Sequence, residues 1–153
     1  MRTIYQKGNK MLHIYTTNSK HLTTPVFEEF RFPLNQKTKE ILLKTQKTLR
    51  YHKGCFEGKA LGISSPQVGS RKRFFVMENL MKLKNDNKTY IDKTNDCQFI
   101  LNPTIIDYSS EKIDQWEGCV STPWAEALVE RPCLITVKYF NHNGAKIIQD
   151  MSG

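Results

Sequence analysis

The sequence contains no apolar run approaching the roughly 20 residues that a membrane-spanning helix needs. Its N-terminal stretch, MRTIYQKGNKMLHIYTTNSK, carries charge but lacks an apolar segment of the secretory type. No C-x-x-C pair occurs among Cys55, Cys97, Cys119 and Cys133, which excludes a zinc ribbon and a thioredoxin-type motif. Because no export signal precedes these cysteines, we predict a cytoplasmic protein with reduced thiols and no membrane partner.

The length and charge of the chain narrow its class further. A chain of 153 residues predicts a single domain spanning 1–153. The net charge of +8 favours polyanions such as ribosomal RNA as partners. The Lys and Arg residues are nevertheless spread along the chain, and no specific nucleic-acid-binding motif accompanies them. A polyanion-binding surface and a solvated basic surface therefore both remain open, and the oligomeric state stays undetermined.

One helix and several short strands are expected. Apolar spacing predicts a helix from Leu34 to about Tyr51, with Asn35 as N-cap and Gly54 as a stop. Residues 1–33 resemble an extended arm, 58–69 a loop and 79–96 a polar surface excursion. Strands are predicted at 73–78, 98–108 (interrupted by Asn102-Pro103), 112–121, 127–129, 134–140 and, after an Asn143-Gly144 turn, 145–148. One helix followed by several short strands indicates an α+β protein.

Two short segments carry the strongest functional signal. The first is Ala60-Leu61-Gly62-Ile63-Ser64-Ser65-Pro66-Gln67, and the second is Glu117-Gly118-Cys119-Val120-Ser121. With Leu101-Asn102-Pro103 between them, they resemble the first two signature motifs of the peptide deformylase family, G-x-G-L-A-A-P-Q and E-G-C-L-S. The resemblance covers about residues 22–150. It implies a peptide-deformylase-like fold of short antiparallel strands around a helix.

The resemblance also implies a chemistry and a set of roles. Family members hydrolyse the formyl group from the N-terminal Met of nascent proteins, using one divalent metal, Fe²⁺ or Zn²⁺. By resemblance, Cys119 is a metal ligand, while the Gln67 amide and the Val120 N–H are oxyanion donors. Gly62 and Ile63 would flank an extended substrate through their backbone. Two further residues, Glu117 and Arg131, would hold the second motif in place.

The third family motif, H-E-x-x-H, is absent from these residues. That motif supplies two His ligands and the general base from a C-terminal helix. The histidines here are His13, His21, His52 and His142, and no two are four apart. A catalytic site of this type needs three protein ligands, and Cys119 is the single one left. We therefore expect a fold truncated before the metal-binding helix, no bound metal and no catalysis.

Three functional hypotheses remain open. The first is a catalytically inactive deformylase-like protein. The second is a non-catalytic module that binds formyl-Met peptides or the ribosome. The third is a deformylase completed in trans by a separate helix fragment. An H-x-x-C pair, His52 and Cys55, offers a remote alternative source of ligands, and Glu126 falls where many family members carry a basic residue near the substrate.

Overall fold

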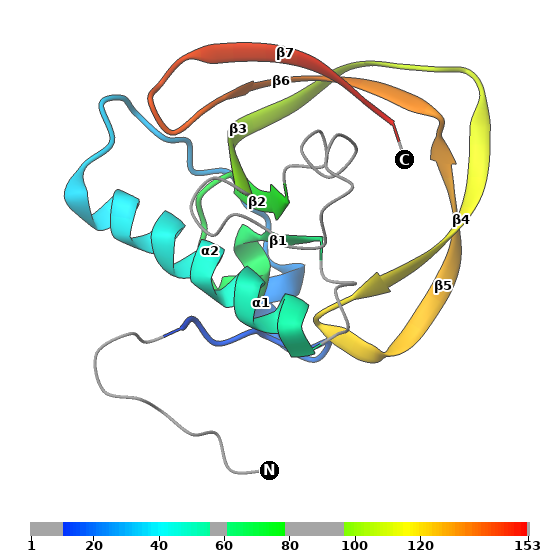
Figure 1. Cartoon of the computed structure of the whole chain (residues 1–153), viewed down its shortest axis with the longest axis horizontal. Helices are drawn as coiled ribbons and strands as arrows, with labels where there is room; N and C mark the ends of the chain where they lie inside the picture. The colour runs from blue at the N-terminus through cyan, green and yellow to red at the C-terminus, as the bar shows by residue number, and fades with distance from the viewer. Residues whose placement is uncertain (1–10, 56–60, 79–96, 153) are drawn as a thin grey trace, which may run out of the picture.

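A computed structural model describes residues 11–55, 61–78 and 97–152. Figure 1 shows a long helix at the lower left, a curved sheet above it and a separate two-stranded hairpin at the right. The class is α+β, as predicted. In chain order the elements are α1 (Lys20–Thr23), α2 (Gln36–Cys55), β1 (Gly62–Ser64), the 3₁₀ helix η1 (Ser65–Val68), β2 (Phe74–Glu78), β3 (Cys97–Tyr108), β4 (Lys112–Cys119), β5 (Thr122–Pro132), β6 (Leu134–Phe140) and β7 (Lys146–Ser152).

All strand pairs are antiparallel and form two sheets. The larger sheet has the order β1-β2-β3-β6-β7, and β4 and β5 form a hairpin of their own. Strand β1 is therefore an edge strand, paired on one side through the register Gly62↔Met77 and Ile63↔Val76. Its other side has no strand partner within the described ranges. This open edge belongs to the first sequence motif, which contains β1.

Helix α2 packs on the sheet through the predicted face. Asn35 caps it, since its Oδ1 accepts from the Thr38 N–H at 2.9 Å. Leu42 and Leu49 are buried in a core cluster with Phe74 and Val76 of β2. The helix continues through Gly54 to Cys55, so the predicted stop at Gly54 is one residue short. Such a difference is common where a helix end has no strong capping signal.

The opposite face of the sheet carries a second, smaller core cluster. It is built on Ile100, Val137 and Tyr139, with Ile135 packed against it. The alternation predicted for 134–140 is confirmed, because Val137 and Tyr139 are buried on one face of β6. The Asn143-Gly144 turn is also confirmed: Gly144 has φ +84° and donates its N–H to the Asn141 carbonyl at 3.0 Å.

Several predicted strand limits are wrong, and strand pairing explains each difference. The loop predicted at 58–69 includes strand β1 and helix η1, although 58–60 lie outside the described residues. Strand β5 is much longer than the predicted 127–129, because it pairs with β4 along its length. Strand β4 ends at Cys119 rather than Ser121, and β7 extends to Ser152 beside β6. Short or weakly patterned strands are specified by their partners more than by their own residues.

The N-terminal arm lies on the core, as predicted for 11–33. Phe30 is buried, and the backbone N–H of Arg73 donates to the carbonyl of Glu28 at 2.8 Å. The short helix α1 in this arm was not predicted from the sequence. The predicted excursion at 79–96 and the first ten residues lie outside the described residues. Across the described ranges, no helix is long and apolar enough to span a membrane.

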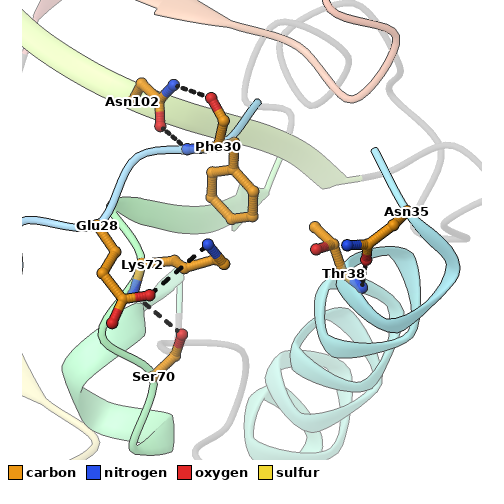
Figure 2. A network of polar contacts seen from close by, with 7 residues as sticks. All are labelled: Glu28, Phe30, Asn35, Thr38, Ser70, Lys72 and Asn102. Atoms are coloured by element: carbon orange, nitrogen blue, oxygen red, sulfur yellow. Dashed lines mark hydrogen bonds and ion pairs between the residues drawn. The ribbon is translucent and has the colours of Figure 1, made fainter. Parts of the chain in front are cut away.

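Asn102 joins the arm to the sheet (Figure 2). Its Oδ1 accepts from the Phe30 N–H at 2.8 Å, and its Nδ2 donates to the Phe30 carbonyl at 3.0 Å. The residue has φ +51°, and the register of β3 shifts between Leu101 and Thr104. The predicted interruption at Asn102-Pro103 is thus a bulge within one continuous strand. Asn tolerates the left-handed conformation better than most residues, which suits it to this position.

Candidate functional site

The first sequence motif forms an edge strand followed by a tight helical turn. Gly62 lies on β1, and a Cβ added there would sit 3.3 Å from the Val76 carbonyl oxygen. Ile63 has only 1% of its surface exposed, so its side chain belongs to the core and only its backbone is available to a ligand. Helix η1 follows and places Gln67 at its third position. The left-handed Gly69 (φ +73°) then ends the turn.

The Gln67 side chain is held at both ends. Its Oε1 accepts from the Ser64 N–H at 2.8 Å and from the Ser64 hydroxyl at 3.1 Å. This is a capping box, and it satisfies the hydroxyl that Ser64 introduces in place of a family alanine. The amide Nε2 donates to Cys119 Sγ and to Ser121 Oγ, each at 3.2 Å. Because Oε1 is fixed, Nε2 points toward the second motif.

The second sequence motif lies at the tip of the β4–β5 hairpin. The register shifts between Gly118 and Cys119, and Cys119 pairs with Thr122 around a two-residue turn. Cys119 is an exposed free thiol, whereas Ser121 is buried. Val120 packs against the larger core cluster, which anchors the tip. The two motifs therefore meet through Gln67 and Cys119, which are 52 residues apart in the chain.

Glu117 and Arg131 form a bidentate ion pair across the hairpin. Arg131 Nε and Nη2 each donate to a carboxylate oxygen of Glu117 at 2.8 Å. The hydrogen bonds to Arg131 lower the pKa of the Glu117 carboxyl below its usual range. This two-point contact joins β4 and β5 at the first residue of the second motif.

These residues surround one cavity of about 770 Å³. Cys119, Gln67 and Gly62 all line it. The remaining lining side chains come mostly from the hairpin: Leu61, Gln115, Trp116, Glu117, Gly118, Val120, Thr122, Pro123, Ala125 and Glu126. Trp116 was not predicted as a site residue, whereas Glu126 was noted at a position near the substrate by resemblance but was given no role. The alternation of β4 and β5 could have indicated them, since both share a hairpin face with Gly118.

The described residues do not provide a complete metal site. No group of three His, Cys, Asp or Glu side chains able to hold a metal occurs within 11–55, 61–78 and 97–152. None of the cavity-lining residues is a histidine. Burial lowers the pKa of His52, and the side chain of Cys55, its suggested partner, lies outside the described part of the chain. Cys119 is thus one sulfur donor in a cavity that would need two further protein ligands.

An open strand edge, an oriented amide and a thiol surround one cavity of this α+β protein. The chain belongs to the polypeptide deformylase family, whose profile matches residues 1–153. It is 31% identical over 142 residues to the peptide deformylase of Wolbachia pipientis subsp. Culex pipiens (strain wPip), covering 93% of this chain and 74% of that protein.

Solved structures agree with this family. The peptide deformylase of Ehrlichia chaffeensis superposes with a TM-score of 0.75 at 28% identity, covering 94% of this chain and 76% of that chain. The enzyme of Thermotoga maritima superposes with a TM-score of 0.74 at 26% identity, covering 94% and 83%. The fold predicted from the two motifs is therefore confirmed.

Proposed function

We propose that these 153 residues are the substrate-binding and oxyanion-binding part of a peptide deformylase, and that alone they do not hydrolyse formyl-Met peptides. The contact between Gln67 Nε2 and Cys119 Sγ carries this proposal, because it puts an oriented donor beside the thiol that we propose as a metal ligand from the family resemblance. The shortage of further donors among the described residues supports the second half of it. The expected nascent-chain substrate follows from family membership.

The chain's own residues would act by binding and orienting the substrate. An extended peptide can add to the open edge of β1, with the backbone of Gly62 and Ile63 providing the ladder. The Gln67 amide, fixed by Ser64, would donate to the formyl oxygen as negative charge develops there. The backbone N–H of Val120 would be the second donor. A divalent metal supplies an activated water in such hydrolases, but the described donors do not suffice to hold one.

The test is metal content and formyl-Met-peptide hydrolysis, measured on one purified sample after equilibration with Zn²⁺ or Fe²⁺. We expect no stoichiometric metal and no turnover above background. A synthetic helix carrying H-E-x-x-H is then added, with the Cys119→Ser variant as control. Turnover only with the helix, and only with Cys119 present, would support completion in trans. Stoichiometric metal and turnover without the helix would contradict the proposal.

A second candidate function is binding to the ribosome, and the surface of α2 favours it. Lys37, Lys39, Lys44 and Lys47 are exposed on this helix, with Glu40 as the exposed acidic residue among them. Basic side chains on one helix suit the phosphate backbone of ribosomal RNA. We expect co-sedimentation with ribosomes that weakens as salt rises and is reduced in a Lys37→Gln, Lys39→Gln, Lys44→Gln variant. Failure of the unmodified protein to co-sediment at low salt would remove this candidate.

A further inference from the structure

The cavity has the opposite charge from the rest of the protein. The chain carries a net charge of +8, yet the charged side chains that line the cavity within the described ranges are Glu117 and Glu126. No Lys or Arg is among these lining residues. A basic protein whose described ligand cavity has acidic walls will attract a cationic rather than an anionic ligand to that cavity.

The carboxylates of Glu117 and Glu126 differ in whether they are free to pair with a cationic ligand. Glu117 is bound at both oxygens by Arg131, so its charge is already compensated. Glu126 is exposed and has no hydrogen bond or ion pair with any described residue. The uncompensated negative charge at the cavity is therefore that of Glu126.

The position of Glu126 is defined by the hairpin register. Glu126 pairs with Gly118, and its Cγ lies 3.7 Å from the point where a Cβ on Gly118 would be. The absence of a side chain at Gly118 leaves space in front of the Glu126 stem, one residue before Cys119. Trp116 lies on the same hairpin face, two residues earlier, with 71% of its surface exposed. A carboxylate and an indole on one face are suited to a Lys or Arg side chain, by ion pairing and by cation–π contact.

From this geometry we infer that Glu126, with Trp116, makes the cavity select formyl-Met peptides that carry Lys or Arg soon after the methionine. The inference rests on the proposed function, because it specifies the substrate class of the same cavity. Leu61 and Gly62 line the same cavity as the hairpin residues, and a peptide added along β1 would direct its side chains alternately toward and away from this cavity. The Lys or Arg side chain directed at the hairpin would meet Glu126.

Isothermal calorimetry with three peptide amides tests the inference: formyl-Met-Ala-Lys, formyl-Met-Ala-Gln and formyl-Met-Ala-Glu, with the formyl-Met-Lys-Ala series covering the second position. In 20–50 mM salt, about the range in which surface charges are weakly screened, we expect the Lys peptide to bind about three- to fivefold more tightly than the Gln peptide. The preference should fade as salt rises. Glu126→Gln should abolish it, and Glu126→Lys should reverse it in favour of the Glu peptide.

The matched control is Glu111→Gln, which makes the same charge change at an exposed residue that does not line the cavity. It should leave the preference intact. Equal binding of all three peptides, or a preference that survives in Glu126→Gln, would overturn the inference while the proposed function stands. If the Glu126→Gln variant no longer binds the neutral Gln peptide, Glu126 has a structural role and the inference is also overturned. If no formyl-Met peptide binds the unmodified chain, the proposed function itself fails.

Discussion

Replacing Asn102 with alanine should lower the free energy of unfolding by about 3–8 kcal/mol. The change removes both hydrogen bonds to the Phe30 backbone and leaves a buried N–H and a buried carbonyl without partners, at about 1–3 kcal/mol each. It also places an alanine at φ +51°, which adds about 1–2 kcal/mol of strain. Since a domain of this size has about 5–15 kcal/mol of stability, urea unfolding should reveal the loss readily.

Two further variants separate the contributions to this effect. Asn102→Gly tolerates the positive φ but still lacks the amide, so it should lose less stability than Asn102→Ala by about 1 kcal/mol. Asn143→Ala is the surface control, because its side chain has no hydrogen bond with the described residues, and it should change stability by less than about 0.5 kcal/mol. If Asn102→Ala unfolds at the same urea concentration as the unmodified chain, the amide does not hold the N-terminal arm on the sheet.

Leu49→Ala should destabilise the protein by about 2–5 kcal/mol, because it opens a cavity where α2 meets the sheet. Leu49 is 0% exposed and belongs to the larger core cluster, together with Ile63 of β1. Because both side chains belong to the same cluster, a cavity at Leu49 should loosen the edge strand as well as the helix. Hydrogen exchange of the β1 amides, measured beside the urea midpoint, should show faster exchange in the variant.

Leu43 on the same helix provides the matched control. The same substitution there removes a side chain that is 51% exposed, so Leu43→Ala should cost less than about 0.5 kcal/mol. Equal losses at Leu49 and Leu43 would mean that α2 does not pack on the sheet through the face that its sequence pattern predicts. If Leu49→Ala lowers the free energy of unfolding strongly but leaves hydrogen exchange in β1 unchanged, packing of α2 does not control the stability of the β1 edge.

The orientation of the Gln67 amide depends on contacts from several segments of the chain. Gln67 is oriented by Ser64 within one turn, and its backbone carbonyl accepts from the Tyr15 N–H of the arm at 2.9 Å. The arm is in turn joined to the sheet through Asn102 and Phe30. The donor that would face a formyl oxygen therefore depends on contacts from residues far along the chain.

Local patterns predicted the features that depend on nearby residues. The N-cap at Asn35, the buried face of α2, the alternation in β6 and the turn at Gly144 all follow from preferences within a few positions. The two sequence motifs predicted the family, and the family profile confirmed it. Each of these signals is contained in a contiguous stretch of sequence, which is why it could be read without a structure.

The sequence by itself determined the family, the fold class and the residue types that could serve the site. The tertiary structure decided which of them meet: Gln67 lies against Cys119, the Ile63 side chain is buried in the core, and Trp116 and Glu126 line the cavity. The physical reason is that antiparallel register and a bulge at Gly118/Cys119 set these positions. Register depends on packing between strands distant in the chain, and a one-residue shift would turn each side chain to the other face.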